Sequence, residues 1–411
     1  MLSVIRHWRV ATSAGSNACA AWGSGHAAAF ATAFGGRSDD NNESQSTVCG
    51  AVVVLNATRC RGCLAALLWA VLSTPCSAAA AESAGEGARA EPLAVKVLVI
   101  NLFFLEAAPW IKALNPTREI RVPGLSEDYP VVKCNAQAVC QMTTGMGHTN
   151  AAASVMAVLY SGLFDVRRTY VLVAGIAGID PRRGTIGSAA WARYVVDAGI
   201  AHEIDARELP RGWHDGYFGV NTDAPDRVPK FDYRTELFRL DEALLQRALA
   251  LSRSVALEDG KDLRAYRLHY LEPPANQPPA VIQCDTLSSD TWWTGRWLGE
   301  HAREWTRLLT EGKGTYCTSQ EEDNAVMNAL TRGSQSGLID LGRVAVLRAG
   351  SDFDRPYPHQ TAFAALKAQR MLAGAGTIAA DNLVRAGMPL VDAIAGHWEM
   401  WQNGVPPVPA P

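Results

Sequence analysis

Two acidic side chains that could transfer a proton follow strand-like segments of this chain. Glu106 comes just after the apolar run 96–102, and Asp352 lies in an acidic turn after the run 344–349. Burial at a strand end raises a carboxyl pKa, so such a group can act as an acid or a base near neutral pH. Each also has an ordinary role open to it. Glu106 could be a helix N-terminal charge, and Asp352 could cap a turn.

Two further segments carry groups suited to a polar, planar ligand. Trp292 and Trp293 follow the turn 287–291, and adjacent aromatic rings can stack on a planar base or form a hydrophobic lid. Glu321 and Glu322 lie in the segment 318–325, which we expect to open a helix. Carboxylates there usually serve capping and the helix dipole, but one can also accept hydrogen bonds from both hydroxyls of a vicinal diol.

Glycines gather where two strand-like runs end. The run 170–174 leads into Gly175, Ile176, Ala177 and Gly178, and the run 131–142 leads into Gly145, Gly147 and His148. Because glycine lets a ligand approach the backbone, and open α/β sheets bind ligands at strand ends, both blocks are candidate walls of a site. His148 could touch a ligand or be an ordinary turn residue.

These segments must be positioned by the elements between them. Strand-like and helix-like runs alternate from residue 96 onward, which indicates an α/β fold. We expect strands over 96–102, 131–142, 170–174, 191–196, 280–284 and 344–349. We expect helices over 150–161, 235–251 with Thr235 as its cap, 360–372 and 377–386. The proline-rich remainder of 201–280 reads as an insertion that covers one edge of the core.

The first ninety residues differ from the rest. Arg59 and Arg61 precede the apolar run 63–72 and the small residues 77–81, an order typical of a secretory leader over 59–81, although a short buried helix would also fit. Residues 1–58 then read as an over-extended or disordered N-terminus. The leader predicts an exported protein, periplasmic or extracellular. An oxidising compartment would permit a Cys134–Cys140 bridge, whose pairing the sequence leaves open.

Charge, apolar runs and His/Cys spacing limit the kinds of partner that the chain is expected to bind. The chain has 411 residues and a formal charge of −3, and its basic residues form no runs, which argues against a nucleic-acid partner. No apolar run of about 18 residues follows the leader, so the mature chain is not expected to span a membrane. No His/Cys spacing suggests a metal, and the predicted chemistry needs no cofactor.

In this order, the segments resemble the nucleoside phosphorylase and nucleosidase superfamily and, within it, the bacterial and fungal purine nucleoside permeases. The resemblance covers about residues 95–405 and is most specific in Gly-Ile-Ala-Gly, Ser-Ser-Asp-Thr-Trp-Trp, Glu-Asp-Asn-Ala and Ser-Asp-Phe-Asp-Arg-Pro. It implies a three-layer α/β/α nucleoside phosphorylase-like domain with a central mixed, twisted sheet. It also implies a homo-oligomer.

The resemblance assigns roles by motif position. Glu106 matches the acid that activates water, and Trp292 the aromatic that stacks on the base, in a base-binding region with Ser351 and residues 175–178. Glu322 matches the glutamate that holds the ribose hydroxyls, with Glu321 in place of a methionine before it. Asp352 matches the residue that protonates or hydrogen-bonds purine N7. Gly145, Gly147 and His148 fall in the region of the nucleophile or phosphate.

One departure bears on the reaction. Phosphorylases of this superfamily hold phosphate with an arginine before the glycine block and a serine inside it, where this chain has Val173 and Ile176. An apolar side chain offers phosphate no donor, so hydrolysis is favoured over phosphorolysis, although Arg182 and Arg183 leave a relocated phosphate site open. The predicted function is purine nucleoside binding and N-glycosidic cleavage. The alternative is a non-catalytic nucleoside-binding protein that supports transmembrane uptake.

Overall fold

A large mixed sheet forms the centre of the part of the chain that the structure, a computed structural model, describes: residues 91–372 and 374–407. The predicted leader and the segment before it lie outside these residues. The sheet's main path runs through β12 (Leu237–Arg239), β9 (Tyr194–Asp197), β14 (Asp285–Ser288), β15 (Tyr316–Gln320), β7 (Tyr170–Ile179), β2 (Val97–Asn101), β5 (Val139–Thr143), β4 (Val131–Cys134) and β3 (Arg118–Arg121). β16 (Val344–Phe353) pairs with β7, and β8 (Ala189–Trp191) joins β16 to β13 (Val281–Gln283).

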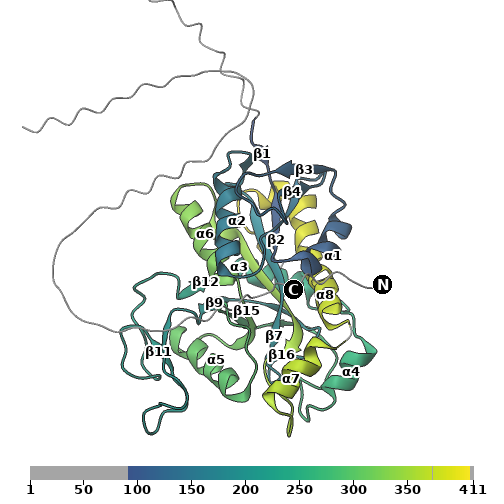
Figure 1. Cartoon of the computed structure of the whole chain (residues 1–411). Coiled ribbons are helices and arrows are strands. Elements are labelled where there is room, and N and C mark those ends of the chain that lie inside the picture. Colours follow the sequence, from purple (N-terminus) through teal and green to yellow (C-terminus); the bar gives the residue numbers. More distant parts are fainter. Residues whose placement is uncertain (1–90, 373, 408–411) are drawn as a thin grey trace, which may run out of the picture. The chain divides into compact units, whose positions relative to one another are not determined.

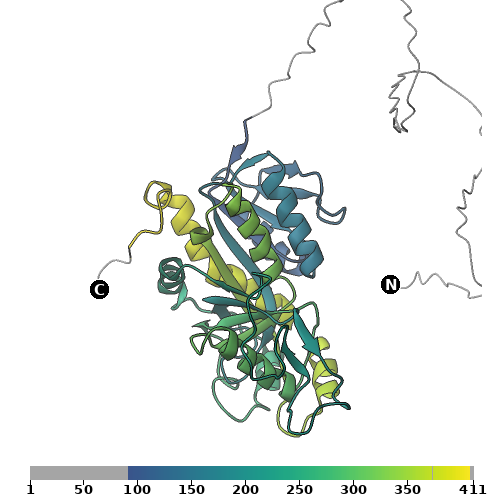
Figure 2. The ribbon, with the colours of Figure 1, turned by 90° about the vertical axis from the view of Figure 1, so that its left-hand side faces the viewer.

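Helices cover both faces of this sheet. Side chains alternate between faces along a strand, so Val171 and Val173 of β7 point to one side and Leu172 to the other. The first side packs on α2 (His148–Tyr160) and α6 (Asp323–Gln335). The second packs on α1 (Phe104–Leu114), α3 (Glu242–Ser252) and α8 (Ala375–Gly396). The predicted three-layer α/β/α arrangement with a mixed central sheet is therefore confirmed (Figures 1 and 2).

The remaining elements lie around this core. Two smaller clusters of apolar side chains involve α4 (Lys261–Arg267) and α5 (Arg296–Leu309). The other elements are α7 (Ala362–Arg370), α9 (Trp398–Trp401), the 3-10 turn η1 (Leu341–Arg343), and two separate two-stranded pairings, β1 (Leu93–Ala94) with β6 (Phe164–Asp165) and β10 (Ala201–Glu203) with β11 (Tyr217–Gly219).

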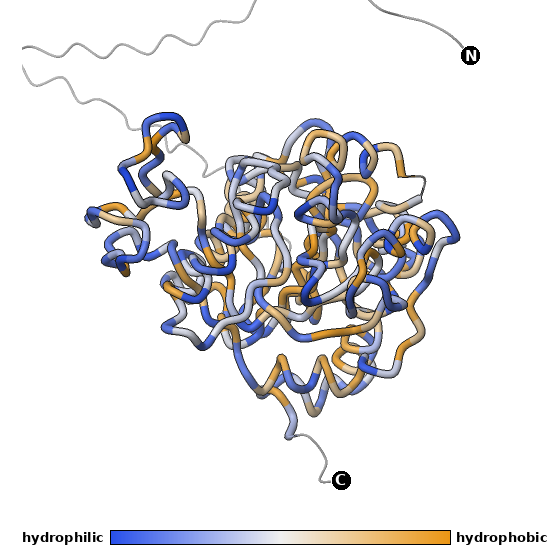
Figure 3. Tube along the Cα trace, turned by 90° about the horizontal axis from the view of Figure 1, so that it is seen from below, coloured by the Kyte–Doolittle hydropathy of each residue, from blue (hydrophilic) through white to orange (hydrophobic). Residues whose placement is uncertain are grey.

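Within residues 91–407, apart from 373, no helix combines the length and apolarity needed to cross a bilayer. Polar and apolar residues alternate along the trace in Figure 3.

Two elements of the structure differ from the sequence prediction, and local hydrogen bonds explain both differences. The run 131–142 is a hairpin, because the Asn135 side chain accepts hydrogen bonds from the backbone N–H groups of Gln137 and Val139 and turns the chain. This turn places Cys134 opposite Cys140, and the two form a disulfide. The helix predicted over 235–251 begins only at Glu242.

The late start of α3 has a clear cause. Asp241, not Thr235, is the N-cap, since its carboxylate accepts a hydrogen bond from Leu244 N at 2.8 Å. The residues Leu237–Arg239 before it pair with β9 as strand β12. Three other element boundaries in the structure also differ from the prediction. The run 191–196 divides into the end of β8 and the strand β9, residues 318–320 end β15 instead of opening a helix, and α8 continues past Pro389 to Gly396.

Candidate functional site

Arg348 lies at the centre of the predicted site residues, although no motif assigned it a role. It projects from β16, and its side chain is 1% exposed. Its Nε donates to Asp323 at 3.1 Å and its Nη1 to the carbonyl of Ile176 at 3.0 Å. Its Nη2 contacts the carboxylates of Glu322 and Asp323. One buried guanidinium therefore joins β7, β16 and the start of α6.

Glu106 faces the same cluster from the first turn of α1. Its two carboxylate oxygens accept hydrogen bonds from the backbone N–H groups of Leu102 at 2.7 Å and Ile176 at 2.8 Å. Burial raises the pKa of Glu106 to about 8, against the lowering effect of Arg348 and the two N–H donors. The carboxyl is thus fixed in position and takes up a proton far more readily than a carboxyl in water.

Glu322 and Glu321 occupy the turn between β15 and α6. Glu322 is the N-cap residue of α6, and its carboxylate accepts a hydrogen bond from Gly147 N at 3.2 Å and lies 3.3 Å from Arg348. Burial raises the pKa of Glu322. Burial and the charge of Glu322 raise the pKa of Glu321 to about 8. Of the two predicted ribose carboxylates, Glu322 therefore contacts Arg348, and the charge of Arg348 also acts on Glu321 and Glu106.

Asp352 lies near the end of β16, where the register against β7 shifts between Gly350 and Asp352. It is within the strand and not in the turn predicted after it. The Ser351 hydroxyl donates to its carboxylate at 2.8 Å. Burial raises the pKa of Asp352 to about 6, while Ser351 and the Trp292 side chain favour its charged form. Trp292 itself is 54% exposed, so its ring is open to a ligand.

Gly147 and His148 lie beside Glu322 at the start of α2. Gly147 has a φ of +87°, a conformation that favours glycine, and it directs its N–H to Glu322. His148 N donates to Asp290 at 2.7 Å, and its Nε2 lies 2.8 Å from the Ser288 hydroxyl. A hollow of about 500 Å³ opens here, and its lining includes His148, Asp290, Asp197 and Asn324.

The glycine block is only partly the open backbone wall that its sequence suggested. A Cβ at Gly175 would overlap the guanidinium of Arg348 and lie 2.6 Å from Leu102. A Cβ at Gly178 would lie 3.1 Å from the Ser319 hydroxyl and 3.5 Å from Asp352. These glycines therefore make room for the protein's own side chains. The block also continues β7 to Ile179 instead of ending it.

The structure thus gathers most of the predicted site residues. Arg348 and the Ile176 peptide link Glu106 to Glu322, Gly147 links Glu322 to His148, and the charge of Asp352 acts on Glu321. Gly145 shapes the turn before α2, where its neighbour is Asn150. The sequence analysis missed Arg348, Asp290 and Ser288. The available signal for Arg348 was a lone cation in an otherwise apolar strand, which must pair with buried carboxylates.

Fold and site together define an α/β protein with a buried, carboxylate-rich site where β7, β16 and three helix starts meet. Residues 94–406 match the family described as purine nucleoside permease. The chain belongs to the purine nucleoside permease family.

Curated relatives and solved structures give the degree of similarity. A probable purine nucleoside permease of Schizosaccharomyces pombe is 40% identical over 320 residues, 74% of this chain and 90% of the relative. The purine nucleoside permease of Candida albicans is 37% identical over 315 residues, 75% of this chain and 77% of the relative. Among solved structures, the 5′-methylthioadenosine/S-adenosylhomocysteine nucleosidase of Neisseria meningitidis is 15% identical, with a TM-score of 0.45 over 72% of this chain and 99% of that one. The futalosine hydrolase of Helicobacter pylori is 15% identical, with a TM-score of 0.43 over 72% of this chain and 97% of that one.

Proposed function

We propose that this protein binds a purine nucleoside and cleaves its N-glycosidic bond. The observation that carries the proposal is a pair of buried carboxyls with raised pKa values, Glu106 at about 8 and Asp352 at about 6, together with a third buried carboxylate, Glu322, whose charge acts on Glu106. Enzymes place groups with such pKa values where a proton must move near neutral pH. Family membership supplies the substrate class.

The three carboxyls suit the steps of this cleavage. As the bond between C1′ and the base breaks, negative charge grows on the base and positive charge on the ribose. Protonated Asp352 donates its proton to the base, and ionised Glu106 takes a proton from water as the water oxygen bonds to C1′. Glu322 accepts hydrogen bonds from the ribose hydroxyls, and its charge favours the cationic sugar. Trp292 stacks on the base.

Water fits this site better than phosphate as the nucleophile. Each guanidinium nitrogen of Arg348 already donates to a protein oxygen, and the N–H of Ile176 is held by Glu106. Val173, at the position of the phosphate-holding arginine, is fully buried in the core. Arg182, which could have formed a relocated phosphate site, pairs with Glu300 at 3.1 Å. Hydrolysis is therefore the proposed reaction.

The second candidate is a nucleoside-binding protein that supports uptake without catalysis. The observation that favours it is the name of the relatives, which are described as permeases. In both candidates we propose that the protein is exported and forms a homo-oligomer. The two candidates differ in one product, because only the enzyme releases free base.

The test is to incubate the purified protein with inosine, adenosine or guanosine, with and without phosphate, and to measure free base by chromatography. Release without phosphate is the expected result. Release only with phosphate would make the protein a phosphorylase, and tight binding without release would make it a binding protein. Asp352→Ala and Glu322→Ala should each abolish release, whereas Asp392→Ala, at an exposed carboxylate on α8, should retain it. Full activity in either site variant would remove the site assignment.

A further inference from the structure

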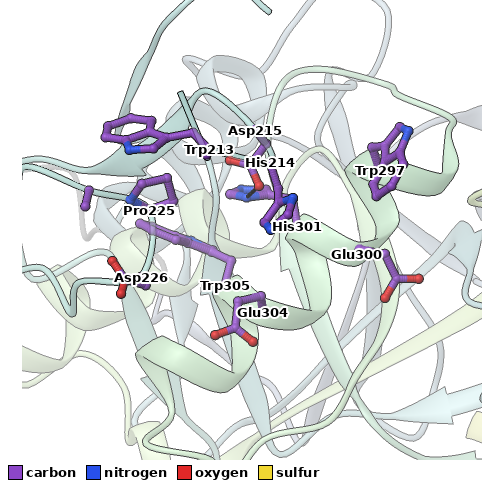
Figure 4. A pocket seen from close by; sticks show the side chains of 12 residues that line it. Trp213, His214, Asp215, Pro225, Asp226, Trp297, Glu300, His301, Glu304 and Trp305 are labelled. Atoms are coloured by element: carbon purple, nitrogen blue, oxygen red, sulfur yellow. Dashed lines mark ion pairs between the residues drawn. The ribbon is translucent and has the colours of Figure 1, made fainter. Parts of the chain in front are cut away.

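A second hollow, of about 690 Å³, lies away from the carboxylate cluster, between α5 and the segment 212–226. Three tryptophans line it: Trp213 from the segment, and Trp297 and Trp305 from α5. In the view of Figure 4, Trp213, Pro225 and Trp305 gather at one end, and Trp297 and Glu300 stand at the other. Trp297 is 68% exposed, so its ring is available to a ligand.

The polar groups of this hollow favour an uncharged planar ligand over a cation. Glu300 is bound by Arg303 and Arg355, and Glu304 is bound by Arg307, so these acids carry little unbalanced charge. Between the tryptophans, His301 lies 3.3 Å from Asp215 and stacks on Trp305 with ring centres 5.8 Å apart. Imidazole and carboxylate groups beside aromatic rings can hydrogen-bond the edge of a heterocycle whose face is stacked.

This hollow adjoins a chain of hollows that reaches the candidate nucleoside site. His301 also lines a second, smaller hollow of about 180 Å³, together with Trp293. Gly199, Ser289 and Thr291 line both that hollow and the one beside His148. Residues 288–297 run along this whole path, from the Ser288 contact of His148, past Trp292 and Trp293, to Trp297.

We propose that the tryptophan-lined hollow at α5 is a second binding site for a purine base or its nucleoside. The proposal rests on the proposed function for its ligand class, because shared lining residues link this hollow to the one beside the nucleoside site. Trp297 stacks on the ring system from one end of the hollow, Trp213 closes the other end, and His301 and Asp215 hydrogen-bond the edge of the ring. The site holds substrate before entry, or released base before exit.

The experiment measures adenine binding to the full chain by titration calorimetry, since adenine has no glycosidic bond to be cleaved. The wild-type protein should bind adenine at two sites per chain. Trp297→Ala should weaken one site roughly 5- to 100-fold, the usual effect of losing a base-stacking ring, and Trp213→Ala should weaken the same site. Trp292→Ala should weaken only the other site. Trp297→Phe should restore most of the affinity, because a smaller aromatic ring still stacks.

The control is Phe363→Ala, at an aromatic residue of α7 that is 77% exposed and outside the hollow, and it should keep both sites. A single adenine site that is unchanged by Trp297→Ala and Trp213→Ala would overturn the inference and leave the proposed function intact. Absence of adenine binding would also overturn it. Suppose that the protein releases no base from nucleosides, and that Trp297→Ala loses adenine binding while Trp292→Ala does not. That result would support this second site and remove the proposed catalysis.

Discussion

At the scale of single residues, the site is organised around one cation. Glu106, Glu322 and Asp323 are all buried, and carboxylates in such a place require a compensating charge. Arg348 supplies it to all three, since it bonds the last two and lowers the pKa of the first. With all its nitrogen atoms occupied, Arg348 shapes and balances the site and is a positioning residue.

Replacing Arg348 by Met should therefore destabilise the fold by about 3–5 kcal/mol near pH 8, because it leaves buried carboxylates without a partner. Arg348 lowers the pKa values of Glu106 and Glu322, so these values rise further without it. A carboxyl whose pKa is higher in the folded than in the unfolded state costs stability as pH rises. The deficit should thus grow as pH rises above the wild-type pKa values of these two groups, which for Glu106 means above about pH 8, as measured by urea unfolding.

The matched control is Arg182→Met, because Arg182 is 64% exposed and pairs with Glu300 at the surface. Its free energy of unfolding should stay within about 1 kcal/mol of wild type. A deficit in Arg348→Met that is equally small, or that does not change with pH, would contradict the compensating role.

The rate of base release should depend on pH through Glu106 and Asp352. The active form needs ionised Glu106, whose pKa burial raises to about 8, and protonated Asp352, whose pKa burial raises to about 6. The rate should rise up to about pH 6, stay level, and fall above about pH 8. Asp352→Asn has no acid to lose, so its residual rate should rise up to about pH 8 and then level off. A decline above pH 8 in this variant would contradict the assignment.

At the scale of elements, the site depends on the pairing of β7 with β16. The sequence predicted both strands but ended them at residues 174 and 349, since glycine and the Ser-Asp pair are poor strand formers. Pairing between the two strands carries each further, to Ile179 and Phe353. The residues that form a strand only through this long-range pairing include Ile176 and Asp352. Local sequence could therefore name Ile176 and Asp352 as candidate site residues without showing that they lie on adjacent strands.

Gly175 is where this pairing is most sensitive to a side chain. Gly175→Ala should cost about 1–3 kcal/mol, because the added methyl overlaps Arg348 and lies 2.6 Å from Leu102 in a packed core. It should also lower base release, since Arg348 would move away from Ile176 and Glu322. The control is Gly396→Ala at the end of α8, where no heavy atom lies within 4 Å of the added carbon. Unfolding in urea measures both, and equal stability of the two variants would refute the close packing at Gly175.

At the scale of the whole molecule, alternation of strands and helices was enough to predict the layers. It could not predict which helices share a face, because α2 with α6, and α1 with α8, meet only across the assembled sheet. The same limit applies to the cysteines. The sequence left the Cys134–Cys140 pairing open, and Cys284 and Cys317, 33 residues apart, are brought together by the fold. Both cysteine pairs are disulfides.

Export can be tested by counting thiols. Of the nine cysteines, Cys134, Cys140, Cys284 and Cys317 are paired, and the other five precede residue 77. If the proposed leader is removed near residues 77–81, the exported protein should show no free thiol when denatured without reductant. After reduction it should show four. N-terminal sequencing and intact mass give the cleavage position. The control is the full chain made and kept in the cytosol, which should begin at Met1 and react at further thiols. An exported form that retains Met1 would refute the leader, because its removal is what takes away the five cysteines before residue 77.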